Sequence, residues 1–248
     1  MTTVDSQPAA GTLLQLWERT VDLGPVGRAL GMAEATGADP VALRAAPYGQ
    51  TSARVLDLRA SLIGPDLAAT AQCPGCGSRV EFTVPLAQLR EASPASDPAS
   101  DGACLGAGGY DVRWRPPTPE DLLAAAAQVD PEASLRRACV SATTTAGDRI
   151  DPARLPADVV EALDRAMSQA DPLADVQVRL SCPDCSAGFD ADLDVAAFVW
   201  TELEARAKRL ICEVDVLART YGWTEPEVLA LTDTRRASYL RMALEGVP

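Results

Sequence analysis

Hydrophobic residues recur at helical spacing through the first sixty residues. The runs Leu13–Val21 and Val55–Leu62 each place leucine or valine on one face of a helix. The second run stops at Gly64-Pro65, a pair that helices rarely continue through. The pattern therefore predicts an all-helical region over residues 1–64.

Two later stretches change to a period of two, which is typical of half-buried strands. In the first, apolar residues alternate with polar ones on both sides of a CPGC motif. The second stretch does the same around CPDC. We expect two similar hairpins, over residues 65–90 and 173–197.

The two motifs supply four cysteines, Cys73, Cys76, Cys182 and Cys185. A CxxC turn places two sulfurs on one edge of a tetrahedron, and two such turns complete the four-thiolate shell that zinc prefers. The spacing predicts one structural Zn²⁺ per chain, held by all four residues in a zinc ribbon.

The similarity of the two hairpins extends beyond the cysteines. When Cys73 is placed on Cys182 and Cys76 on Cys185, the apolar positions that follow also coincide. The matching pairs are Val80 with Phe189, Phe82 with Ala191, Val84 with Leu193, Leu86 with Val195 and Leu89 with Phe198. The register predicts two copies of one hairpin related by an approximate twofold axis.

CPxC also occurs in thiol oxidoreductases, where the first cysteine begins a helix that lowers its pKa. Here each motif precedes a strand pattern, which favours metal over a redox dithiol or a disulfide. Of the other cysteines, Cys104 falls in a predicted loop, while Cys139 and Cys212 lie on apolar helix faces and are interpreted as small buried hydrophobic residues.

The segment between the hairpins begins with a stretch rich in Ser, Pro, Ala and Gly, residues 91–109, which predicts a flexible loop. Residues 110–172 combine one strand with three capped helices. A long amphipathic helix is predicted from Phe198, within a C-terminal region that covers residues 198–248. The fold class is α+β: mostly helical, with a split zinc ribbon and a helical insert between its halves.

Composition narrows the possible functions. The net charge of −13 disfavours nucleic acid and acidic membrane surfaces, because both are bound largely through Lys and Arg. The absence of histidine removes the commonest general base, and no phosphate loop or nucleophile motif is present, so we expect no enzyme. The first residues resemble no signal peptide, and we expect a cytoplasmic protein.

The C-terminal region combines aromatic residues with a locally basic segment. Trp, Tyr and Arg are enriched at binding hot spots, although basic residues near a helix end are also explained by the helix dipole. Acidic groups elsewhere, such as Glu202 with Glu204 and the alternating Asp190, Asp192 and Asp194, are interpreted as solvated surface.

The stretch LARTYGWTEPEVLALTDTRRASYL, Leu217–Leu240, resembles the tail segment of baseplate-associated proteins from contractile-tailed phages and bacterial contractile injection systems, including baseplate hub assembly chaperones. The motifs LLQLWERT, GPVGRAL, GPDLAATAQCPGCGSRVEF, VRWRPPTPEDL and DPLADVQVRLSCPDC resemble a longer version found in injection systems, which carries a split four-cysteine ribbon. The candidate partner-binding residues carried over are Tyr221, Trp223, Leu229, Leu231, Arg235, Arg236 and Tyr239.

The resemblance implies a non-enzymatic baseplate assembly factor or minor baseplate component of a phage-tail-like contractile injection system, with baseplate or hub proteins as partners. Two other functions stay open at this point. A zinc-ribbon adaptor in transcription or nucleic-acid processing requires a basic face, and a thiol oxidoreductase requires reactive thiols at Cys73 or Cys182.

Overall fold

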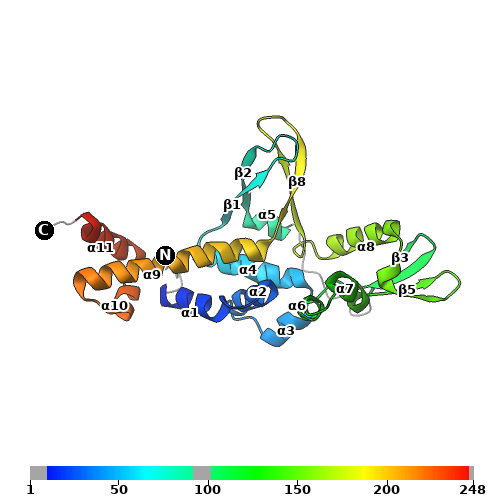
Figure 1. The fold of residues 1–248 in the computed structure, drawn as a ribbon, viewed down its shortest axis with the longest axis horizontal. Helices are drawn as coiled ribbons and strands as arrows, with labels where there is room; N and C mark the ends of the chain where they lie inside the picture. Colours follow the sequence, from blue (N-terminus) through cyan, green and yellow to red (C-terminus); the bar gives the residue numbers. More distant parts are fainter. Residues whose placement is uncertain (1–9, 92–101, 246–248) are drawn as a thin grey trace.

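The computed structural model of the chain describes residues 10–91 and 102–245. Its longest helix, α9 (Val195–Tyr221), forms a central axis along which the other parts are arranged (Figure 1). A pair of hairpins rises from the middle, an insert lies at one end, and two short helices lie at the other. The protein is therefore elongated, with three projecting parts, and has the predicted α+β fold.

The body of the protein is a layer of helices packed on α9. It contains α1 (Ala10–Thr20), α2 (Pro25–Glu34), α3 (Pro40–Ala45) and α4 (Tyr48–Leu62). Leucines at helical spacing, such as Leu30 and Leu56, face Val199 and Leu203 of α9 in one buried cluster. Within the described residues, the chain up to Leu62 contains helices and no strand.

A buried arginine joins this body to the start of the first hairpin. Arg59 is 2% exposed, and its guanidinium donates to both carboxylate oxygens of Glu202, at 2.8 and 3.0 Å. It also donates to the carbonyl oxygen of Gly64 at 2.8 Å. Because a two-point pair of this kind fixes direction as well as distance, Arg59 sets the position of the chain as it leaves α4.

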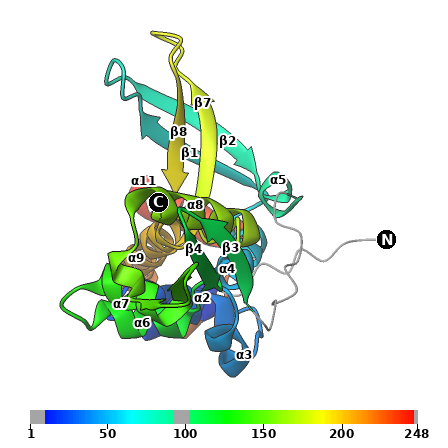
Figure 2. The same cartoon turned by 90° about the vertical axis from the view of Figure 1, so that its right-hand side faces the viewer.

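The hairpins are β1 (Asp66–Gln72) with β2 (Arg79–Pro85), and β7 (Val176–Ser181) with β8 (Gly188–Leu193). Each is a separate two-stranded antiparallel sheet. Figure 2 shows the two hairpins lying against each other. The near ends of their strands contribute Leu67, Val84, Val176 and Leu193 to the core of the helical body, and their far ends enclose a separate small cluster.

The predicted repeat continues into a helix after each hairpin. The strand β2 runs directly into α5 (Leu86–Glu91), and β8 is followed at Val195 by α9. Leu86 and Val195 occupy the matched positions, and both are buried in the core of the body. The long helix therefore begins at Val195, three residues before the predicted start, because Asp194 caps it with a hydrogen bond to the backbone N–H of Ala197.

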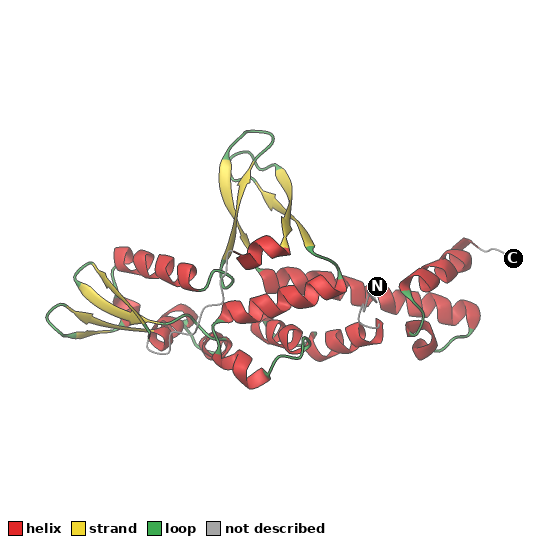
Figure 3. Ribbon diagram, turned by 180° about the vertical axis from the view of Figure 1, so that it is seen from behind, coloured by secondary structure: helices red, strands yellow, loops and turns green. Residues whose placement is uncertain are grey.

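The insert is a small α/β unit with its own core. Its sheet has the order β3-β4-β5-β6, made of β3 (Ala103–Ala107), β4 (Tyr110–Trp114), β5 (Val140–Thr144) and β6 (Arg149–Ile150). The helices are α6 (Pro119–Ala126), α7 (Pro131–Cys139), the 3₁₀ turn Pro152–Arg154 and α8 (Ala157–Ala170). Figure 3 shows the sheet and α8 projecting beyond the helical body.

This sheet corrects the predicted loop over residues 91–109. Glu91 ends α5, and residues 103–107 form a strand that is joined to β4 by the tight turn Gly108-Gly109. Both glycines have positive φ, 56° and 81°, as a two-residue hairpin turn requires. Small residues hid the strand from the sequence pattern. Residues 92–101 lie outside the described ranges.

A close backbone contact fixes the insert to the helical body. The backbone N–H of Gly49, in the first turn of α4, donates to Asp171 Oδ2 at 2.9 Å, and the Asp171 side chain is buried. Pro47, the residue before α4, offers no side-chain cap. Asp171 therefore caps α4 from 122 residues away in sequence.

The contact leads to a prediction for Gly49. A Cβ at this position would overlap the Asp171 carboxylate and lie 3.1 Å from the backbone nitrogen of Ala174. Gly49→Ala should lower the free energy of unfolding by about 2 kcal/mol, because overpacking and loss of the buried hydrogen bond exceed the ~1 kcal/mol that alanine gains in a helix. Urea unfolding monitored by circular dichroism measures the difference.

Gly11→Ala in α1 is the matched control, since a Cβ there meets nothing within 4 Å. It should leave stability unchanged or slightly raise it. A Gly49→Ala protein as stable as the Gly11→Ala protein would contradict the capping role of Asp171.

Candidate metal centre

The four predicted cysteines meet at the far end of the paired hairpins. The Sγ atoms of Cys73 and Cys185 are 3.6 Å apart, and so are those of Cys76 and Cys182. All four sulfurs lie within 4.8 Å of one another. Each short distance joins one hairpin to the other, so the cluster bridges two stretches separated by more than a hundred residues.

The turns that carry the cysteines have the same backbone geometry. In the first, the N–H of Cys73 donates to Ser78 and the N–H of Gly77 donates to Cys73. The equivalent bonds of the second turn are Cys182 to Ala187 and Ser186 to Cys182, at distances within 0.1 Å of the first pair. The predicted repeat therefore includes these two CxxC turns, which we call the knuckles.

Equivalent positions in the two turns also share a left-handed conformation. Gly77 has φ 75° and Ser186 has φ 59°, and Ser186 is the one non-glycine residue with positive φ in the described part of the chain. Serine adopts this conformation at some energetic cost. Its presence shows that the knuckle geometry is kept where the sequence does not favour it.

The surroundings divide the sulfurs into two classes. Cys73 and Cys182 are 1% and 2% exposed and pack with Val80, Phe189 and Ala191. Cys76 and Cys185 are exposed. The site is thus anchored on an apolar floor and open to solvent on one side, which gives an ion a route of entry.

The thiols strongly influence one another's ionisation. Hydrogen bonds from the Ser78 side chain and backbone lower the pKa of Cys76 to about 6, with help from Cys185 and Cys182. At Cys185 a hydrogen bond from the backbone of Ala187 lowers the pKa, but the neighbouring thiols outweigh it and raise the pKa to about 12. Ionisation of one thiol therefore disfavours ionisation of the next, because the two negative charges repel each other. A cation between the sulfurs would remove that repulsion.

The arrangement fits a tetrahedral metal ion. Four sulfurs at the usual zinc–sulfur bond length of ~2.3 Å would be about 3.8 Å apart, close to the two short separations found here. Each motif leads into a strand, β2 or β8, and not into the helix on which a reactive CPxC dithiol depends. The cluster can therefore hold one metal ion, and its donor set leaves no open coordination position.

The remaining cysteines lie far from this cluster. Cys139 is buried at the end of α7, as predicted, and burial raises its pKa to about 11. Cys104 lies in strand β3 and is exposed. Cys212 is also exposed, so its predicted burial on an apolar face of the long helix is wrong. The buried positions of this stretch of α9 are Leu210 and Leu217, and Cys212 lies on a different face of the helix.

The acidic groups considered as candidates have structural partners. Glu202 pairs with Arg59, and Glu204 pairs with Lys208 one turn later. Asp190 and Asp192 lie on the exposed face of β8 next to Arg179 and Gln177, as the alternation predicts. These contacts account for the carboxylates without any further chemistry.

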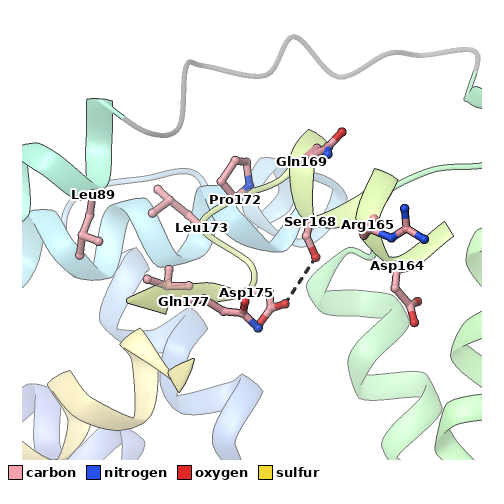
Figure 4. Close-up of a pocket in the computed structure, with 10 residues that line it drawn as sticks. Leu89, Asp164, Arg165, Ser168, Gln169, Pro172, Leu173, Asp175 and Gln177 are labelled. Carbon is pink, nitrogen blue, oxygen red and sulfur yellow. Dashed lines mark hydrogen bonds between the residues drawn. The ribbon is translucent and has the colours of Figure 1, made fainter. Parts of the chain in front are cut away.

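A cleft with a volume of about 540 Å³ lies on the seam between the insert and the hairpins. Figure 4 shows Asp164, Arg165 and Ser168 of α8 on one side and Leu89 of α5 on the other. Ser168 Oγ donates to Asp175 Oδ2 at 3.4 Å. Burial raises the pKa of Asp164. The cleft thus lies between α8 of the insert and α5, which follows the first hairpin.

The predicted partner-binding residues lie on a three-helix end formed by α9, α10 (Glu225–Leu229) and α11 (Asp233–Glu245). The rings of Tyr221 and Trp223 stack at 4.7 Å between centroids, and Tyr239 meets both edge-on, at 5.8 and 4.8 Å. Leu229 packs against the core of the body. The aromatic residues thus hold α11 against the end of α9 while remaining partly exposed.

The two neighbouring arginines differ sharply. Arg236 is 4% exposed and donates to Glu213 at 2.6 Å, to Asp233 at 2.6 Å and to the carbonyl oxygen of Leu231 at 3.2 Å. Arg235 is exposed on the same helix. The structure therefore brings Tyr221, Trp223, Arg235 and Tyr239 to the surface at this end, and places Arg236 inside it.

The comparison with known families decides the relationship. A family model described as T4 bacteriophage base plate protein matches residues 46–194. The chain belongs to this baseplate protein family. No curated protein and no solved structure matches significantly. The match begins just before α4 and ends at the cap of α9, so it contains both hairpins and the insert, while the C-terminal helices lie outside it.

Within the described ranges, no helix has both the length and the apolar character for crossing a bilayer. The baseplate relationship expected from the sequence is confirmed, and baseplate proteins are the partners that family membership suggests.

Substitution of the buried Arg236 tests whether this residue anchors the C-terminal helices. Arg236→Ala removes the arginine that binds Glu213 and one of the two arginines that bind Asp233, the other being Arg206, and should destabilise α10 and α11 by about 2 kcal/mol or more. Hydrogen exchange of the α11 amides should then become much faster. Arg235→Ala is the control and should change exchange little, since an exposed substitution costs within about 0.5 kcal/mol. Equal protection in both variants would contradict an anchoring role for Arg236.

Proposed function

We propose that this protein is a non-enzymatic assembly factor or minor baseplate component of a phage-tail-like contractile injection system, acting in the cytoplasm. The observation that carries the proposal is the family match over residues 46–194, which covers every strand of the structure. An elongated body with three separate projections also suits a protein that contacts several neighbours at once.

We propose that the four-cysteine cluster binds one structural Zn²⁺. Zinc has the strongest claim among common metals because it accepts four thiolates in a tetrahedron without redox chemistry. With all positions filled by Cys73, Cys76, Cys182 and Cys185, the ion would stabilise the ribbon and activate no water. The residues of the chain supply the floor, the knuckle hydrogen bonds and the exposed face of this site.

The energetic argument supports a stabilising role. Closing a loop of about a hundred residues costs on the order of 4 kcal/mol by the logarithmic loop law. Structural zinc contributes roughly 10–16 kcal/mol in small zinc-dependent domains. The binding energy exceeds the closure cost by a wide margin, so one ion is sufficient to hold the two hairpins together.

The C-terminal end is the proposed partner surface. Its candidate residues remain Tyr221, Trp223, Leu229, Leu231, Arg235, Arg236 and Tyr239, of which the buried Arg236 would act by shaping the surface. Tyr221 is exposed, Trp223 and Tyr239 are partly exposed, and α11 adds the exposed Arg235 and Arg241, in a locally basic segment of a chain of net charge −13. Such a segment suits an acidic or amphipathic surface of a baseplate or hub protein.

Metal content is the first test. Purified, untagged protein should contain about one zinc equivalent per chain, measured by elemental analysis. The Cys182→Ser protein should lose most of its zinc and unfold at a lower temperature. Only three thiolate ligands remain in it, and a buried hydroxyl takes the place of the fourth. Cys104→Ser, which changes a cysteine distant from the site, is the control and should keep full metal content. Zinc below half an equivalent in the unmodified protein would refute the assignment.

Particle assembly is the second test. In cells that produce the particle, Tyr221→Ala combined with Arg235→Glu should sharply reduce the number of complete particles seen by electron microscopy, since both residues are exposed at the proposed surface. Arg209→Glu is the control, because it reverses a charge at another exposed position of α9.

Circular dichroism should show that both proteins are folded. A normal yield of contractile particles from the double variant would rule out this surface, and a normal yield after deletion of the gene would rule out the assembly role itself.

A further inference from the structure

Within residues 10–91 and 102–245, no other strand pairs with the outer edge of strand β3. The strand lies at the margin of the insert sheet, with β4 on one side only. Its five residues, Ala103–Ala107, pair with residues 110–114 of β4. A free strand edge of this length is a template for another strand.

The register shows which groups point outward. The N–H of Arg115 donates to Cys139, and the N–H of Thr145 donates to Gly109, so the odd-numbered residues of this part of β4 bond toward β5. Even-numbered residues of β4 must then bond toward β3, where their partners are Ala103, Leu105 and Ala107. The backbone groups of Cys104 and Gly106 consequently face away from the sheet.

Natural sheets protect such edges with charged residues, proline or bulges. Every other marginal strand in the described part of the protein carries at least one charge, and β6 has only two residues. The sequence of β3, ACLGA, has neither charge nor proline, and its pairing with β4 is regular. Both Cys104 and Gly106 are exposed.

The apolar side of β3 is also incomplete. Ala103, Leu105 and Ala107 pack against the insert core but are only half-buried, in contrast to Val112 on the neighbouring strand. On the opposite side of the sheet, small residues of β3 leave a hollow of about 440 Å³ beside Arg113 and Asp111. A further strand would cover the half-buried row and complete the core.

We propose that β3 pairs antiparallel with β3 of a second copy of this chain, around a twofold axis at Leu105. The two outward-facing residues lie symmetrically on either side of Leu105, so Cys104 of each copy would meet Gly106 of the other. Each such pair exchanges two N–H···O bonds, which gives four in total. The backbone N–H and C=O groups of Cys104 and Gly106, which β4 does not bind, would then all be paired.

The same register makes the side chains self-complementary. Leu105 faces its own copy across the axis, and Ala103 faces Ala107, so the half-buried rows join on the face that packs against α8. Because β3 is uncharged, the acidic character of the chain places no like charges opposite each other in the pairing. The strand lies at one extremity of the molecule, away from the hairpins and the C-terminal helices, which stay accessible (Figures 1 and 3).

Two variants at one position test the pairing. Gly106→Pro removes the outward N–H in both copies, and proline is tolerated on an edge strand. Gly106→Ala is the matched control, because a Cβ there meets nothing within 4 Å and the N–H is kept. Sedimentation velocity over a concentration series should show a dimer for the unmodified protein and for Gly106→Ala. Association of Gly106→Pro should be weaker by about tenfold or more.

Cys104 provides an independent measurement of the register. The Cys104 side chains of the two copies would be diagonal neighbours on the open face, about 7–8 Å apart. In a Cys212→Ser background, a short bismaleimide should crosslink the dimer through Cys104, and the crosslink should disappear in Cys104→Ser and in Gly106→Pro. Circular dichroism of Gly106→Pro should match that of the unmodified protein.

The outcomes distinguish the interpretations. A monomer at all concentrations would overturn the proposal, and would leave the edge to a strand of another protein. A dimer that persists in Gly106→Pro, or that does not crosslink through Cys104, would place the interface elsewhere and would also overturn it.

Discussion

The meeting of four thiols at the tips of two hairpins is the constraint on which the arrangement of this protein depends. Cys73 approaches Cys185 across 112 residues of chain, and Cys76 approaches Cys182 across 106. Two-stranded hairpins are marginal alone, and the apolar cluster beneath the sulfurs is small. The near ends of the strands are secured by the helical body, and a metal ion held by the four cysteines, as proposed above, would secure the far ends. With both attachments in place, the ribbon would have little freedom to move.

Much of this arrangement could be predicted from local sequence. Alternating residues around CPGC and CPDC predicted both hairpins, and the matched register predicted their equivalence, which the knuckle hydrogen bonds confirm. Helix caps are equally local: Thr118 and Thr224 each form a capping box at the start of a helix. These features depend on residues within a few positions of one another, so a single sequence contains the whole signal.

Features that depend on distant partners could not be predicted in this way. Nothing near Asp171 indicates that it caps a helix beginning at Tyr48, and nothing near Gly49 explains why a side chain is excluded there. Arg236 is indistinguishable from Arg235 in the sequence, yet one is buried between two carboxylates and the other is exposed. Strand β3 was missed for a different reason, since alanine and glycine give no periodic signal.

The insert leaves and re-enters the body at neighbouring points. Leu89, the last buried residue before it, and Leu173, just after it, both belong to the core of the helical body and line the same cleft. A segment whose two ends lie so close together can change in length or fold at little cost to its host, because closure entropy grows only logarithmically. A change in the length of the inserted unit would therefore leave the ribbon and the helical body in their present positions.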